Sequence, residues 1–185
     1  YLNLTHLLNM YLIKSHDSFF MEKILNLLMQ KNFPINIDNK SRIYGTINFK
    51  FSQDTLSIKY ENDVLNLNTP TDFNKLWKGL YKLLLNHKII LNNLEYFPLK
   101  EEILFNNNSL KLRNTHNQII KLIIQSKNHS IIKEDLYKGI WPLDKEIQIN
   151  KLDTHLTNLK NLLKDSFNYD LKFKTNAGVL TFIFD

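Results

Sequence analysis

The strongest hydrophobic pattern in the chain covers residues 149–164. Its apolar residues recur at the spacing of one helix face, and they are Ile149, Leu152, Leu156, Leu159 and Leu163. The opposite face carries Asn150, Lys151, Thr154, Thr157, Asn158 and Asn161. A solvated helix face is usually rich in Glu and Lys, so these amide and hydroxyl groups favour a surface that exchanges hydrogen bonds with a partner. Nucleic-acid base edges are one such partner; the alternative is a solvated face in a chain rich in Asn.

The first half of the chain shows strand and helix patterns. A buried strand is predicted at residues 7–13, and then a helix capped by Asp17 or Ser18, with an inner face of Phe20, Ile24, Leu27 and Leu28. Alternation predicts a β-hairpin over residues 47–60, with inward positions at Ile47, Phe49, Phe51, Leu56, Ile58 and Tyr60. A short strand at residues 64–67 precedes a helix that is capped by Thr71 and reaches about His87, with an inner face of Phe73, Leu76, Trp77, Leu80 and Leu84.

The second half follows a boundary that we predict at residues 88–93. Strands are expected at residues 94–99, 103–105 and 110–112, followed by a helix that Asn114 caps. A second helix over residues 133–141 is stopped by Pro142, and the helix over residues 149–164 is the third. Strands at residues 171–174 and 179–184 form a hairpin with its tip at residues 175–178. The fold class is therefore α+β, with a small α/β domain at residues 1–90 and a second domain at residues 94–185.

Composition narrows the function classes. The 185 residues carry a net charge of +6, which permits nucleic-acid binding without demanding it. The absence of Cys excludes disulfides, thiolate zinc sites and Cys nucleophiles, and it fits a reducing cytosol. No apolar run approaches the roughly 18 residues of a membrane span. We therefore expect a cytoplasmic protein that does not contact a membrane.

The candidate metal ligands, nucleophiles and phosphate-binding loops give little support for catalysis. The histidines outside the third helix lack a spacing that groups them as metal ligands, and they are His6, His16, His87, His116 and His129. His16 and Asp17 are adjacent, but no nucleophile accompanies them. With four Gly, the chain has no phosphate-binding or dinucleotide-binding loop. We expect no enzyme activity, no cofactor and no bound metal, and we expect Trp77 and Trp141 to be core residues.

Residues 94–184 resemble the winged helix-turn-helix effector domain of OmpR/PhoB-type response regulators. The segment Lys133-Glu-Asp-Leu-Tyr-Lys-Gly-Ile-Trp141 is similar to the second-helix pattern R-E-x-L-x-x-x-V-W. The segment Asn150-Lys-Leu-Asp-Thr-His-Leu-Thr-Asn-Leu-Lys-Asn-Leu-Leu163 resembles the recognition helix, R-T-V-D-V-H-I-x-R-L-R-x-K-L. The segment Leu171-Lys-Phe-Lys-Thr-Asn-Ala-Gly-Val179 is similar to the wing pattern I-x-T-V-R-G-x-G-Y.

This resemblance implies a transcription regulator that binds double-stranded DNA, with its third helix in the major groove and its wing on the backbone. The implied DNA-binding residues are Asn150, Lys151, Thr154, His155, Thr157, Asn158, Lys160, Asn161, Lys164, Lys172 and Lys174. Arginines of the family stand here as Asn150, Asn158, Lys160 and Thr175, and each lost cation near a phosphate lowers affinity. The alternative is a winged helix that has lost DNA binding and contacts another protein.

The first half resembles a shortened, degenerate receiver domain. Tyr11-Leu-Ile-Lys-Ser-His-Asp17 is like a receiver's first strand and acidic turn, and Leu67-Asn-Thr-Pro-Thr-Asp-Phe-Asn-Lys-Leu76 is like its last turn and helix. Thr69 stands where a receiver has the Lys that contacts the phosphoryl group, and only Asp17 fits the acidic pair. The resemblance implies regulation without phosphorylation, and a homodimer formed through the first half.

Overall fold

The computed structural model describes residues 11–15, 22–26 and 45–184 of the 185-residue chain. The described residues form two compact units, one that ends at His87 and one that begins at Lys88. We call them the N-terminal and C-terminal units and describe each by itself. The predicted caps at Asp17 and Ser18, and the inner-face residues Phe20, Leu27 and Leu28, lie outside the described residues.

The sheet of the N-terminal unit has the order β1-β2-β3-β4. Strand β1 (Tyr11–Ser15) pairs in parallel with β2 (Gly45–Phe51), whereas β3 (Thr55–Tyr60) and β4 (Asp63–Asn68) each pair antiparallel with the preceding strand. The predicted hairpin over residues 47–60 is confirmed: Phe49 lies opposite Ile58, and both side chains are buried. Phe51, at the end of its strand, is exposed instead.

This strand arrangement differs from the parallel, doubly wound sheet of a receiver domain. Residues 52–54 and 61–62 join β2 to β3 and β3 to β4, and connections this short can only link antiparallel neighbours. The described strands β2–β4 therefore run in other directions than those of a receiver domain. The alternation over residues 47–60 predicted the antiparallel pairing of β2 with β3, so only the two flanking segments carry the receiver resemblance.

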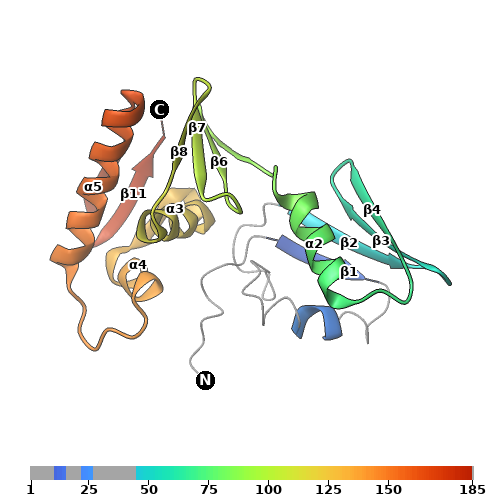
Figure 1. Ribbon diagram of the computed structural model, residues 1–185. Helices are drawn as coiled ribbons and strands as arrows, with labels where there is room; N and C mark the ends of the chain where they lie inside the picture. Colours follow the sequence, from blue (N-terminus) through green and yellow to red (C-terminus); the bar gives the residue numbers. More distant parts are fainter. Residues whose placement is uncertain (1–10, 16–21, 27–44, 185) are drawn as a thin grey trace. The chain divides into compact units, whose positions relative to one another are not determined.

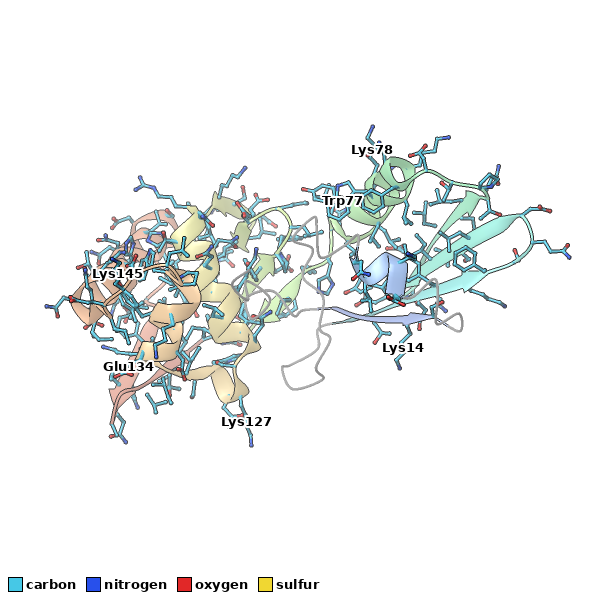
Figure 2. The ribbon with its side chains drawn as sticks, turned by 90° about the horizontal axis from the view of Figure 1, so that it is seen from below. Lys14, Trp77, Lys78, Lys127, Glu134 and Lys145 are labelled. Carbon is cyan, nitrogen blue, oxygen red and sulfur yellow. The ribbon has the colours of Figure 1, made fainter. Side chains whose placement is uncertain are left out.

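Helix α2 (Phe73–Leu84) packs one face against this sheet. Its cap is Asp72, not the predicted Thr71: the Asp72 carboxylate accepts a hydrogen bond from the Lys75 backbone N–H at 2.8 Å. The predicted inner face is buried at Leu76, Leu80 and Leu84, and is half-buried at Phe73 and Trp77. Lys78 lies on the opposite side and points away from the sheet (Figure 2).

Gly79 lets α2 approach the sheet closely. A Cβ atom at this position would lie 2.4 Å from the Leu65 Cδ2 atom of β4. A side chain there would push the helix away from the strand or displace Leu65. The contact explains why a residue with low helix propensity occupies the middle of the helix.

The C-terminal unit begins with an antiparallel sheet of order β5-β6-β7-β8. Its strands are β5 (Ile89–Leu91), β6 (Leu94–Phe97), β7 (Glu102–Phe105) and β8 (Asn108–Lys111). The first of them lies in residues 88–93, which we expected to be a boundary segment. Three residues are too short for alternation to stand out, and only the pairing of β5 with β6 defines them as a strand.

Helices and then a β-hairpin follow this sheet along the chain (Figure 1). The helices are α3 (Asn114–Gln125), α4 (Lys133–Ile140) and α5 (Ile149–Phe167), and the short 3-10 helix η2 (Lys127–His129) follows α3. The hairpin strands are β10 (Lys172–Asn176) and β11 (Val179–Ile183). Strand β9 (Ser130–Ile132), which the sequence pattern did not reveal, pairs with β11 and gives the sheet order β10-β11-β9. The α+β class predicted from the sequence is confirmed.

The apolar stripe of α5 forms the core of the C-terminal unit together with α3 and α4. The predicted stripe residues Leu152, Leu156, Leu159 and Leu163 are buried, and Phe167 continues the stripe one turn beyond the predicted end. Helices α3 and α4 pack against α5, and their buried apolar residues include Ile119, Ile120, Ile123, Leu136 and Ile140. Burying each large aliphatic side chain contributes roughly 1.5–3 kcal/mol, so this stripe fixes the outer face of α5.

A buried hydrogen-bonded chain ties the first sheet of this unit to α3. The Tyr96 hydroxyl donates to Asn117 Oδ1 at 2.6 Å, and Asn117 Nδ2 donates to Glu101 Oε1 at 3.0 Å. Tyr96 and Asn117 are both almost fully buried. None of the helices in the described part of the chain is long and apolar enough to cross a membrane.

Candidate nucleic-acid interface

The outer face of α5 is an exposed strip of uncharged polar side chains. Its exposed residues are the predicted positions Asn150, Thr154, Thr157, Asn158 and Asn161. The Thr154 hydroxyl donates to the Asn150 carbonyl, and the Thr157 hydroxyl donates to the Asp153 carbonyl, each at 2.9 Å. The hydroxyl lone pairs remain able to accept. The described chain offers no hydrogen-bond partner to the Asn150, Asn158 and Asn161 amides, so this face is equipped to exchange hydrogen bonds with a ligand.

A shallow surface depression lies along the first half of this face. It is lined by Asn150, Asp153, Thr154, Thr157 and Asn158. Asp153 is the one charged residue of that lining, and its carboxylate accepts a hydrogen bond from Lys133 Nζ of α4 at 2.6 Å. The ion pair neutralises the Asp153 charge locally, so the carboxylate opposes an approaching phosphate less than an unpaired one would.

Lys151, which we expected to face the DNA groove, is instead engaged at the start of the helix. Its ammonium donates to Asp144 Oδ2 at 2.9 Å and lies 4.2 Å from the centroid of the Trp141 ring. The Tyr137 hydroxyl also donates to Asp144, and these two hydrogen bonds lower the pKa of the Asp144 carboxyl. The Asp144 carboxylate in turn raises the pKa of Lys151. Lys151 therefore stabilises the packing of the segment that follows α4 against the first turn of α5.

Two further candidate residues of α5 also contact the protein. Lys160 forms an ion pair with Asp170 at 3.2 Å, where Asp170 is exposed and Lys160 is partly exposed. His155 is half-buried, with its ring centroid 5.3 Å from Trp141 and 6.1 Å from His116. The sequence pattern placed His155 beside the outer face, and the structure shows it packed between α3 and the end of α4.

The remaining cations lie at the end of α5 and on the hairpin. Lys164, Lys172 and Lys174 are all exposed. Lys172 and Lys174 are two residues apart on β10, so they share one side of the strand. Lys164 and Lys174 have no ion-pair partner within the part of the chain that the structure describes. Lys164 and Lys174 are therefore available to phosphate groups.

Sequence reasoning missed a group of residues at the start of α3. Arg113, Thr115 and His116 line a second hollow together with His155, Asn158 and Asn161 of α5. No motif links the two segments, since about 40 residues separate them in sequence and only the packing of α3 on α5 brings them together. Within the described residues, no group of three or more His, Asp or Glu side chains could hold a metal ion.

Comparisons with known proteins support part of the family resemblance. The chain is 26% identical over 78 residues to "Response regulator ArlR" of Staphylococcus epidermidis, and 30% identical over 70 residues to the protein of that name from Staphylococcus saprophyticus. The matches cover 42% and 38% of this chain, and 35% and 31% of those proteins. The chain thus spans about a third of the length of the curated relatives it matches. No protein-family model matches it. The comparison shows weak, partial homology to response regulators.

Proposed function

We propose that the C-terminal unit is a winged-helix DNA-binding domain of a transcription regulator of the OmpR/PhoB type. The exposed amide and hydroxyl face of α5 carries this proposal. Three Asn side chains on it, Asn150, Asn158 and Asn161, have no partner in the described chain. Asn pairs bidentately with the edge of adenine in the major groove. The major groove is wide enough to admit an α-helix.

In the proposed complex, α5 lies in the major groove and the β10–β11 hairpin contacts the backbone. Asn150, Thr154, Thr157, Asn158 and Asn161 face base edges. Lys164, Lys172 and Lys174 contact phosphates, which position the domain without reading sequence. Lys151, His155 and Lys160 support the helix from its flanks and make no direct base contact in this proposal. We assign no reaction, cofactor or metal to this unit.

The N-terminal unit supplies a dimer surface in this proposal. One domain with three phosphate-contacting lysines binds weakly, and linking two half-site contacts raises the overall affinity without any new contact. The unit acts without phosphorylation, because Thr69 occupies the position of the receiver's Lys and the β2–β3–β4 strands are antiparallel. A small-molecule phosphodonor with Mg²⁺ should leave the mass and the oligomeric state unchanged. An acid-labile gain of one phosphoryl group that disappears in Asp17→Asn or Asp54→Asn would contradict this.

A duplex titration at two salt concentrations tests DNA binding. Three phosphate contacts per protomer predict that affinity falls about 40-fold between roughly 50 and 200 mM monovalent salt, since each contact contributes about 0.9 to the logarithmic slope. The duplex pool should be rich in A·T pairs to match the Asn face. No binding to any such duplex at the lower salt concentration would refute the proposal.

Protein recognition is the second candidate function. Its support is the pairing of Lys151 with Asp144 and of Lys160 with Asp170, which leaves Lys164 as the lysine of α5 without an ion-pair partner in the described chain. The same amide face would then accept hydrogen bonds from another protein. Recovery of one defined protein partner by the intact chain, together with absent DNA affinity, would decide for this function.

A further inference from the structure

Helix α2 covers one face of the N-terminal sheet, and the opposite face of the strands is open. Leu65 of β4, which meets Gly79 of α2, lies opposite Ile58 of β3, so both belong to the covered face. Successive residues of a strand point to opposite faces. The alternate positions of β2, β3 and β4 therefore form the open face, where each is exposed or half-buried: Thr46, Asn48, Lys50, Thr55, Ser57, Lys59, Val64, Asn66 and Asn68.

Three lysines gather on this open face. Lys14 of β1 pairs with Asn48, which pairs with Lys59, so the two lysines lie in one row across three strands. Their backbones are about 10 Å apart, and Lys50 lies about 7 Å farther along β2 than Asn48. Lys14 points to the side of the unit opposite Lys78 of α2 (Figure 2). Lys14, Lys50 and Lys59 are exposed and have no ion-pair partner within the described chain.

The described positions of the open face hold no acidic side chain. Across the strands, Lys59 lies opposite Asn48 and Val64, and Lys50 lies opposite Ser57. A sheet face that only meets water gains stability from opposite charges on neighbouring strands, and these strands place none there.

The acidic residues near these strands lie elsewhere. Asp63 is opposite Tyr60, on the covered face, and Glu61 is close enough to Tyr60 to raise the pKa of its hydroxyl. Asp54 lies in the turn between β2 and β3. The positive charge of the open face is therefore not neutralised from within the described strands.

The residue types on this face also favour binding over strand stability. Asn and Lys are depleted in strands because they gain little from the pleated surface. The open face nevertheless places Asn48, Asn66 and Asn68 beside the lysines. Their amides both donate and accept hydrogen bonds, so the face combines cations with neutral donors.

We propose that this open face binds the sugar-phosphate backbone of duplex DNA, with Lys14, Lys50 and Lys59 on phosphates and the neighbouring amides donating to phosphate oxygens. Lysines and polar side chains of this kind contact the backbone without reading sequence. No aromatic side chain stands at the described positions of the face, so the bases of a single strand have nothing to stack on. A second copy of the chain would bring like charges together, so the dimer contact uses another surface. The inference goes beyond the proposed function, which places DNA on the C-terminal unit, and does not depend on it.

Amide chemical shifts of the full chain provide the test. A short duplex of mixed sequence, at about 50 mM monovalent salt, should shift the Asn48, Lys50 and Lys59 amides in a saturable way. The triple variant Lys14→Gln/Lys50→Gln/Lys59→Gln should lose these shifts. Its logarithmic salt slope of duplex binding should be smaller than that of the parent by about 2.7, since each of the three contacts contributes about 0.9.

The matched control removes the same charge from the other side of the same unit. Lys75→Gln/Lys78→Gln/Lys82→Gln replaces three exposed lysines of α2. This variant should keep the shifts on the open face and the salt slope of the parent. Equal losses in the two triple variants would show a general effect of net charge and would overturn the assignment. Trp77 fluorescence of each variant verifies that the N-terminal unit is folded.

The distribution of the shifts separates this inference from the proposed function. Shifts confined to α5 and the β10–β11 hairpin would overturn the open face as a DNA contact and leave the proposed function standing. Shifts on the open face that persist in Asn158→Ala/Lys164→Gln would support it independently of α5. If polyglutamate shifts the same amides at the same affinity as the duplex, the face is suited to an acidic protein and the DNA assignment is wrong.

Discussion

Lys151 and Asp144 join the first turn of α5 to the segment that follows α4, with 2.9 Å between Nζ and Oδ2. The same ammonium lies over the Trp141 ring, and Tyr137 donates to the same carboxylate. The cluster holds the entry of α5 at a fixed place on α4. A lysine that a sequence comparison assigns to DNA therefore positions the helix that would read the DNA.

Lys151→Met should lower the urea midpoint of the C-terminal unit, because it removes both the ion pair and the ring contact. Lys164→Met, the matched control on the same helix, should leave the midpoint unchanged and weaken DNA binding instead. The pKa of Asp144 is lowered in the fold, so the pair stabilises the unit above the ordinary carboxyl pKa and loses this effect as the pH falls through the lowered value. The difference between parent and Lys151→Met should accordingly vanish at strongly acidic pH. Equal effects of the two variants on the midpoint would contradict the assignment.

Lys164→Gln and Lys174→Gln test the phosphate contacts. Each variant should reduce the logarithmic salt slope of DNA binding by about 1 and weaken all duplexes alike. Lys78→Gln serves as the control, since Lys78 is exposed on α2 of the N-terminal unit and points away from its sheet (Figure 2). If the salt slope of DNA binding is unchanged in both Lys164→Gln and Lys174→Gln, these lysines do not contact phosphates.

Asn158→Ala should reduce discrimination between duplexes rather than general affinity. One bidentate Asn–adenine pair contributes about 1–3 kcal/mol of base discrimination. Competition between the preferred duplex and a shuffled sequence of the same composition measures it. The preference should fall while the salt slope remains that of the parent. A uniform loss of affinity for both duplexes would assign Asn158 to the backbone instead.

The sequence pattern predicted α5 well because its burial follows helical periodicity. Leu152 to Leu163 define the buried stripe, and their spacing places Asn158 on the outer face without knowledge of any other element. Strand β9 was missed because its three residues have no periodicity of their own and pair with β11, which lies about 50 residues later. The antiparallel pairing of β2 with β3 was predictable from the alternation over residues 47–60, whereas the receiver resemblance of the flanking segments carries no information on strand direction.

The candidate site likewise has a part that local periodicity predicts and a part that depends on residues in other elements. Exposure of the Asn and Thr positions on α5 depends on one helix, whereas the ion pairs of Lys151 and Lys160 depend on Asp144 and Asp170 in the connecting segments. The cap of α3 differs from the prediction by one residue. Asn114 is a preferred capping residue and was predicted to cap, yet the structure makes it the first helical residue and leaves Arg113 at the cap.

The stability of both units should decline as the pH falls below about 6.5, the ordinary pKa of His. Burial lowers the pKa of His87 in the N-terminal unit and of His116 in the C-terminal unit. The unfolded chain then binds more protons than the folded chain in this range, so acid favours unfolding. Trp77 reports on one unit and Trp141 on the other, once the other Trp is replaced by Phe. His116→Gln should flatten the pH profile of the Trp141 signal and leave that of the Trp77 signal unchanged; flattening of both would contradict the assignment.

Asn168 ends α5 in a left-handed conformation, with φ of 54° and ψ of 31°. Its backbone N–H donates to the Lys164 carbonyl at 2.8 Å, a common helix end that Gly and Asn tolerate. Asn168→Gly should leave the free energy of unfolding unchanged or raise it slightly, whereas Asn168→Val should lower it by about 1–2 kcal/mol, since a side chain with a branched Cβ is strained there. The matched control is Asn161→Ala on the exposed middle of α5, which should raise stability by about 0.5 kcal/mol through helix propensity. Urea denaturation followed by Trp141 fluorescence in a Trp77→Phe background measures all three. If the Val variant is as stable as the Gly variant, the helix does not end in this conformation in solution.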